Sequence, residues 1–153
     1  MVQIETSLVE TSRIIANIDL RCMTVKSPEE LPPIRDAAHF VAVNFTGLCN
    51  GILTLVVPTP VAFDLTKRVL STAAGVEFAA DQIDVDLINN TLGELANMSA
   101  GHYLRSNGLA ADSDLFAPKL LTAIEVKKQI SSGVGLMICA YQSHVFEALF
   151  KVA

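Results

Sequence analysis

The sequence has 153 residues, of which 51% are hydrophobic and 18% are charged. This composition is too apolar for a disordered chain and predicts one compact domain over residues 1–153. The formal net charge of −5, with no cluster of lysine and arginine, excludes electrostatic capture of nucleic acid or of an anionic membrane surface.

The cysteines and the N-terminal residues indicate the cellular compartment in which the protein is expected. Cys22, Cys49 and Cys139 are odd in number and far apart, so neither a zinc site nor a disulfide framework is expected. The first residues lack a basic stretch leading into an apolar run, and no window holds 18 uninterrupted apolar residues. We therefore expect a cytoplasmic protein.

In the first half, periodicity and turn residues predict two helices around a hairpin. The predicted elements are an amphipathic helix over 3–18, an edge strand starting at 24–25, a proline-rich loop over 27–33, a hairpin of 39–45 and 52–57 around Gly47, and a helix over 60–74 that ends at Gly75. In the second half, the predicted elements are a helix around 88–101, strands at 120–126 and 135–141, and a last helix from Ser143.

The helix around 88–101 has two contrasting faces. On a helical wheel its core face holds Ile88, Leu92, Leu95, Ser99 and Tyr103. The opposite face, within roughly 140° to 240° of Ile88, holds Asp86, Asn90, Gly93, Glu94, Asn97 and Gly101. Because the two glycines have no side chains, we expect a partner's backbone to approach closely there. Asp84 and Asp86 are placed to stabilise the start of this helix.

An offset of 84 positions indicates an internal duplication of approximately residues 1–69 and 85–153. It pairs Ile4 with Ile88, Leu8 with Leu92 and Glu10 with Glu94, and later Gly51 with Gly135. Each half then reads as helix, loop, hairpin and helix. This pattern predicts an α+β fold, a mainly antiparallel sheet with packed helices and pseudo-twofold α-β-β-α halves. Arg13 stands where the second helix has Asn97, so only the second helix carries a Glu/Asn pair.

Two stretches resemble a known family. The run Leu92-Gly93-Glu94-Leu95-Ala96-Asn97-Met98-Ser99-Ala100-Gly101, followed by Asp114-Leu115-Phe116-Ala117-Pro118, resembles the signature of the CheC/CheX/FliY phosphatases of bacterial chemotaxis. Upstream, the run from Cys49 to Pro58 resembles that family's glycine-led strand. Because only one helix has the complete Glu/Asn pair, the chain is most similar to the CheX type. It departs from the family at Asn90, where Asp or Ser is usual, and at Pro118, which arrives slightly early.

The resemblance implies a mechanism. Asn97 would position water for attack on the aspartyl phosphate of a CheY-like response regulator, and Glu94 would dock on the partner's lysine. Asp86, Asn90, Gly93 and Gly101 would contact the partner. This chain would bind no cofactor or metal itself, since Mg²⁺ is expected on the phosphorylated partner. The resemblance also implies a homodimer.

The sequence leaves one alternative function open and disfavours the others. A non-catalytic signalling or flagellar-switch adaptor of the same fold is the alternative, whereas a small-molecule enzyme lacks a nucleophile–base pair or cofactor loop. Cys139 reads as a core residue rather than as a partner of His144. The histidines lack metal-site spacing, and the aspartates at 81, 84 and 86 read as capping residues, not as a calcium loop.

Overall fold

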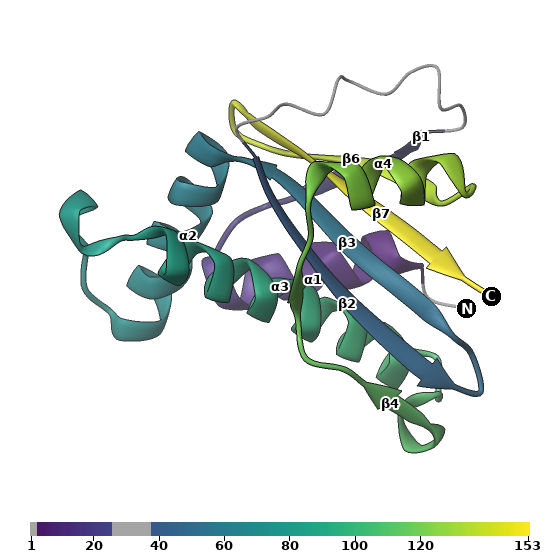
Figure 1. Cartoon of the computed structure of the whole chain (residues 1–153). Helices are drawn as coiled ribbons and strands as arrows, with labels where there is room; N and C mark the ends of the chain where they lie inside the picture. The colour runs from purple at the N-terminus through teal and green to yellow at the C-terminus, as the bar shows by residue number, and fades with distance from the viewer. Residues whose placement is uncertain (1–2, 26–37) are drawn as a thin grey trace.

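The computed structural model describes residues 3–25 and 38–153 (Figure 1). The predicted loop at 27–33 lies outside the described residues. The helices are α1 (Ile4–Ala16), α2 (Thr59–Ala74), α3 (Val85–Ser106) and α4 (Ala123–Ser131). The strands are β1 (Arg21–Val25), β2 (Ala38–Gly47), β3 (Gly51–Pro58), β4 (Ser113–Leu115), β5 (Lys119–Leu120), β6 (Gly135–Tyr141) and β7 (His144–Val152).

The described strands form one antiparallel sheet of seven strands. Their order is β1-β6-β7-β3-β2-β4, with β5 also paired to β2. The β2–β3 and β6–β7 hairpins meet at the centre, where β3 pairs with β7. The order is symmetric about this pair, since β2 mirrors β6 and β4 mirrors β1. Each edge strand pairs with the hairpin of the other half, so the two halves interlock.

Helices cover both faces of the sheet. Helices α1, α2 and α3 pack on one face, against alternate strand residues such as Val43, Leu55 and Phe146. Helix α4 packs on the other face, where Val126 contacts a smaller apolar cluster that includes Phe40 and Leu149. Because both faces are covered at the centre, β3 carries a run of buried residues instead of a strict alternation.

These elements confirm the predicted α+β class with a mainly antiparallel sheet and packed helices. Helix α1, the β2–β3 hairpin, helix α2 and strand β6 lie where the sequence pattern placed them. The edge strand is also present, but β1 starts at Arg21, earlier than the predicted start at 24–25. Helix α2 ends at Gly75, whose φ of 68° is the left-handed conformation that glycine adopts freely.

The predicted strand at 120–126 is wrong. Strand β5 ends at Leu120, and α4 begins three residues later, at Ala123. Thr122 and Glu125 form a capping box, in which Thr122 N donates to Glu125 Oε2 at 2.7 Å and Glu125 N donates to Thr122 Oγ1 at 3.3 Å. This Thr-x-x-Glu pattern stabilises a helix start, and it outweighs the β-branched residues nearby.

The predicted helix from Ser143 is also wrong, because β7 occupies this segment. Tyr141 pairs with His144 across a two-residue turn, and Gln142 takes the left-handed conformation that such a turn requires. The offset of 84 therefore matches α1 to α3 but wrongly matches α2 to β7. Each half contains a helix, an edge strand and a hairpin, and the second half does not end in a helix.

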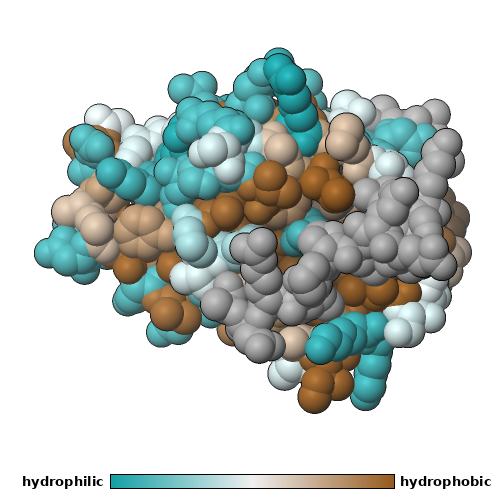
Figure 2. Space-filling view, turned by 90° about the horizontal axis from the view of Figure 1, so that it is seen from above, coloured by the Kyte–Doolittle hydropathy of each residue, from teal (hydrophilic) through white to brown (hydrophobic). Residues whose placement is uncertain are grey.

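Apolar side chains also reach the surface. Figure 2 shows several of them among hydrophilic side chains on the side seen from above. Large exposed apolar residues of the chain include Met23, Leu120, Ile124 and Val145. Single exposed apolar residues are common on monomeric proteins. The homodimer therefore stays a prediction.

Candidate functional site

Helix α3 is the predicted 88–101 helix, and it is longer at both ends. Asp84 caps its start, with Oδ1 accepting a hydrogen bond from Leu87 N at 2.8 Å. The predicted core face is buried, and the Ser99 hydroxyl within it donates to the Leu95 carbonyl oxygen at 2.7 Å. The helix packs against α1, β2 and β4. Its outer face is therefore held on a rigid base.

Glu94 and Asn97 lie one helical turn apart on this outer face. Glu94 is exposed and Asn97 is half-buried. Within the described ranges 3–25 and 38–153, neither side chain has a hydrogen-bond partner or an ion pair. Residues three apart on a helix are neighbours, so the free carboxylate and carboxamide are presented together to solvent.

The matching positions of α1 are arranged differently. Glu10 and Arg13 form an ion pair with each other on the surface of α1. The carboxylate of Glu10 is thus already occupied by a neighbouring guanidinium, whereas the carboxylate of Glu94 is not. The two helices have similar apolar faces, but only α3 presents an unoccupied pair.

A shallow groove of about 440 Å³ adjoins Glu94. Asp86, Asn90 and Glu94 line it along α3, while its apolar lining comes from other elements: Val41, Pro118 and Leu120. Asp86 and Asn90 are both exposed, so the structure brings them together with Glu94 as the wheel predicts. Asn97 lies one turn farther along the helix, outside the groove lining.

Gly93 and Gly101 are buried, which corrects the sequence interpretation of an open glycine face, although Gly93 also lines the groove beside Glu94. Both are buried under the chain's own 115–118 segment. A Cβ at Gly93 would lie 3.0 Å from Pro118 Cβ, and a Cβ at Gly101 would lie 3.6 Å from Leu115 Cδ2. The atoms that approach these glycines are therefore the chain's own, and they belong to side chains such as those of Pro118 and Leu115. A helical wheel gives the direction of a side chain but not the segment packed against it.

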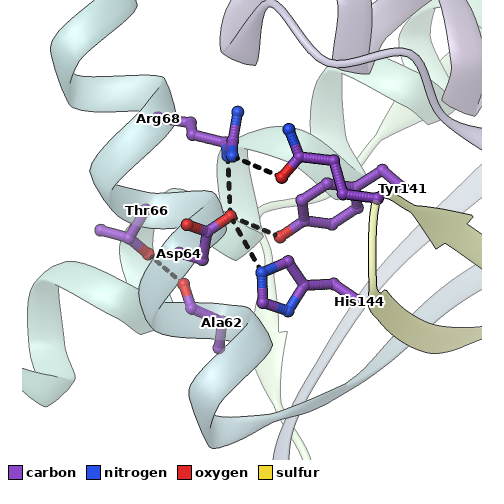
Figure 3. A network of polar contacts seen from close by, with 7 residues as sticks. Ala62, Asp64, Thr66, Arg68, Tyr141 and His144 are labelled. Atoms are coloured by element: carbon purple, nitrogen blue, oxygen red, sulfur yellow. Dashed lines mark hydrogen bonds and ion pairs between the residues drawn. The ribbon is translucent and has the colours of Figure 1, made fainter.

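A second polar cluster joins α2 to the β6–β7 hairpin (Figure 3). Asp64 Oδ2 accepts hydrogen bonds from Arg68 Nε at 2.7 Å and from the Tyr141 hydroxyl at 3.0 Å, and His144 Nε2 lies 3.6 Å from it. Arg68 also donates to Gln142 Oε1 at 2.9 Å. The sequence analysis did not find this cluster, since its members lie on elements distant in the chain.

The electrostatics of this cluster indicate a structural role. Burial opposes ionisation of Asp64, but hydrogen bonds from Arg68 and Tyr141 and the charges of Arg68 and His144 outweigh it, so the pKa of Asp64 is lowered. Burial and the Asp64 carboxylate raise the pKa of Tyr141. The Asp64 carboxylate is therefore held by partners within the fold, unlike the carboxylate of Glu94.

The remaining candidates do not form a site. Cys139 is fully buried, as expected for a core residue, and its thiol lies against Cys22 rather than His144. The described residues contain no group of three or more His, Cys, Asp or Glu side chains placed to hold a metal ion. Among the helices of the described ranges, none is long and apolar enough to cross a membrane.

Comparisons with known proteins show which solved structures share this fold. The sequence matches no protein-family model, and no curated protein matches it at a significant level. Solved structures do match over nearly the whole chain. The CheX protein of Vibrio vulnificus is 14% identical with a TM-score of 0.67, covering 98% of this chain and 93% of its own.

Two further structures extend the comparison. The CheX of Borrelia burgdorferi, in a CheX–CheY–BeF₃–Mg²⁺ complex, has a TM-score of 0.68 at 13% identity, over 97% of this chain and 94% of its own. FliY of Thermotoga maritima has a TM-score of 0.58 at 13% identity, over 95% of this chain and 83% of its own. The predicted resemblance to CheX, CheC-like and FliY chemotaxis proteins is thus confirmed at the level of the fold.

The contacts at the two glycines predict different effects of alanine on stability. Gly101→Ala should raise the free energy of unfolding by up to about 1 kcal/mol, because alanine favours a helix and its Cβ meets a flexible arginine side chain. Gly93→Ala should give no gain, because its Cβ presses on Pro118. Urea denaturation of both variants measures this difference, and an equal gain in both would show that Pro118 does not pack on α3.

The Asp64 cluster predicts a pH-dependent loss of stability. Asp64→Asn should lower the free energy of unfolding by about 2 kcal/mol at pH 7, where the hydrogen-bonded carboxylate is charged. Because its folded pKa lies below the ordinary 3.8, this contribution is present above that value and is lost as the pH falls through the folded pKa. The difference in the free energy of unfolding between wild type and Asp64→Asn should therefore become smaller at low pH.

Denaturation curves at several pH values measure that gap. Glu77→Gln is the matched control, because Glu77 is exposed and forms a surface ion pair with Lys67 at 3.2 Å. This variant should cost less than about 0.5 kcal/mol at pH 7. If Asp64→Asn costs no more than Glu77→Gln, the cluster does not hold α2 to the hairpin.

Proposed function

We propose that this chain docks on a CheY-like response regulator and accelerates hydrolysis of its aspartyl phosphate. The observation that carries the proposal is the pair of exposed Glu94 and half-buried Asn97 on the outer face of α3, where neither side chain has a partner among the described residues. The equivalent pair on α1 is closed by the Glu10–Arg13 ion pair. One face of the molecule is therefore chemically available, and its pseudo-symmetric counterpart is not.

Asn97 suits the positioning of water. A carboxamide accepts a hydrogen bond through its oxygen and donates others through its nitrogen, and it brings no negative charge toward a phosphoryl group. An aspartyl phosphate with its own Mg²⁺ needs little beyond a water held in line with the leaving oxygen. Asn97 would position that water. Helix α3, which is capped at its start and buried along one face, would keep Asn97 in place.

Glu94 suits docking. Its free carboxylate would pair with a lysine of the receiver domain and thereby set the register of Asn97 against the phosphoryl group. The groove beside Glu94 adds an apolar contact through Val41, Pro118 and the exposed Leu120. Asp86 and Asn90 on the same groove would supply peripheral polar contacts. Buried Gly93 and Gly101 would act indirectly, by letting the 115–118 segment lie close to α3.

The comparison structures support the partner. The fold is shared with a CheX captured in a complex with CheY, beryllofluoride and Mg²⁺. By the same proposal the Mg²⁺ belongs to the response regulator, and this chain contributes only side chains. A homodimer in the cytoplasm would be compatible with this arrangement, because the α3 face described here lies within one chain.

Replacing Asn97 tests catalysis. Asn97→Ala should slow dephosphorylation of the regulator about 100-fold, because the attacking water loses its positioning group, while binding is largely kept. The measurement is phosphate loss from a phosphorylated receiver domain with Mg²⁺ present. Arg13→Ala, at the matching position of α1, is the control and should leave the rate unchanged.

Two outcomes separate the alternatives. Equal rates for wild type and Asn97→Ala would remove Asn97 from the mechanism. If the wild-type chain binds the phosphorylated receiver without accelerating hydrolysis, the chain is a non-catalytic adaptor of the same fold.

Replacing Glu94 tests docking. Glu94→Lys should weaken binding to a beryllofluoride-activated receiver domain at least about tenfold, since an attraction to the partner's lysine becomes a repulsion. A binding titration by calorimetry measures this change. Glu10→Lys on α1 introduces the same charge at the matching position and should bind like wild type. Unchanged affinity of Glu94→Lys would contradict the docking role.

A further inference from the structure

Two cysteines that are 117 residues apart in the chain lie opposite each other in the sheet. Cys22 on β1 and Cys139 on β6 are direct partners in the antiparallel register. Their sulfur atoms lie 2.9 Å apart, and both thiols are free. Facing residues of antiparallel strands have Cα atoms about 4.5 to 5.5 Å apart, which falls within the span of a disulfide.

From this juxtaposition we propose that Cys22 and Cys139 form a reversible disulfide, so that the β1–β6 pair is a site of oxidative modification. The oxidant class is a low-molecular-weight disulfide such as oxidised glutathione. The proposal is independent of the α3 face and of the proposed function. It also differs from the sequence expectation, in which spacing along the chain gave no reason to pair these residues.

The two thiols have different roles in the exchange. Cys22 is half-buried on an edge strand, whereas Cys139 is fully buried. The oxidant therefore reaches Cys22 first. The neighbouring Cys22 thiol and burial raise the pKa of Cys139, and the carboxylates of Glu147 and Glu5 raise it further. Cys139 is thus a poor first nucleophile, and it is suitably placed for the second step.

The chemistry balances in two exchange steps. Cys22 loses its proton, and its sulfur attacks oxidised glutathione, forming a mixed disulfide and releasing one glutathione thiolate. Cys139 then loses its proton, and its sulfur attacks Cys22 Sγ, releasing the second glutathione thiolate. The two released thiolates take up the two protons. The protein is oxidised by two electrons, and one glutathione disulfide is reduced to two thiols.

The link would fix the edge of the sheet. In the described sheet, β1 has β6 as its strand neighbour and is the terminal strand of the order. A covalent bond at the second of the five residue pairs in this register would hold β1 in place. It would close a loop from Cys22 to Cys139 that contains the β2–β3 hairpin, α2, α3 and α4. Such a large closed loop restricts the unfolded chain strongly, so the oxidised protein should be the more stable form.

The test is oxidation of the full chain with oxidised glutathione at pH 8. Under non-reducing digestion, mass spectrometry should find a peptide linking Cys22 to Cys139, and the intact chain should lose about 2 Da for two hydrogen atoms. Dithiothreitol should reverse the change. The thermal midpoint of the oxidised chain should lie several degrees above that of the reduced chain.

Variants assign the steps. Cys49→Ser is the matched control, because Cys49 lies outside the β1–β6 pair, and it should oxidise like wild type. Cys139→Ala should trap a stable glutathione adduct on Cys22, since nothing resolves it. Cys22→Ser, at a half-buried position that tolerates a polar atom, should abolish the linked peptide even if Cys139→Ala does not fold.

Three outcomes would overturn the proposal. The first is a glutathione adduct on Cys22 that persists in the wild-type chain without a linked peptide. The second is a disulfide that involves Cys49 or joins two chains in place of the Cys22–Cys139 link. The third is full recovery of free thiols after exposure to oxidant.

Discussion

The antiparallel pairing of β3 with β7 is the constraint on which the rest of this structure depends. It joins the two hairpins into one sheet, with Leu53 opposite Phe150 and Leu55 opposite Ala148. Because each edge strand belongs to one half and pairs with the hairpin of the other, neither half has a complete sheet without its counterpart. The buried faces of the sheet then determine where α1 and α3 lie, and the orientation of α3 determines which of its residues reach solvent.

Helix α3 combines a buried base with an unoccupied outer face. Its apolar residues are covered by the sheet and α1, and its glycines admit the 115–118 segment along one side. That segment brings Pro118 next to Glu94, and β5 after it brings Leu120, so that both line the groove beside Glu94. The segment that resembles the family signature at 114–118 therefore has a physical role here, since it forms one wall beside the polar pair.

The pseudo-symmetry of the fold sharpens the contrast between the two halves. The offset of 84 residues pairs α1 with α3, yet Arg13 forms an ion pair with Glu10 on α1, while the uncharged Asn97 cannot form one with Glu94. A single residue difference thus decides whether the carboxylate is available to a partner. The Asp64 cluster shows the opposite use of a carboxylate, since hydrogen bonds from Arg68 and Tyr141 commit it to holding α2 on the sheet.

The sequence by itself determined the features that depend on neighbours along the chain. Helical spacing located α1, α2 and α3, the Gly47 turn located the β2–β3 hairpin, and the wheel grouped Asp86, Asn90, Glu94 and Asn97 on one stripe. Tertiary structure alone decided the rest. Residues 144–152 form β7 because β3 and β6 offer hydrogen bonds on both sides. Gly93 and Gly101 are buried by a segment that a helical wheel does not include. Cys22 lies opposite Cys139 because of the register between β1 and β6. Local periodicity carries no information on which distant segment covers a face, and burial, pairing and thiol proximity all depend on that segment.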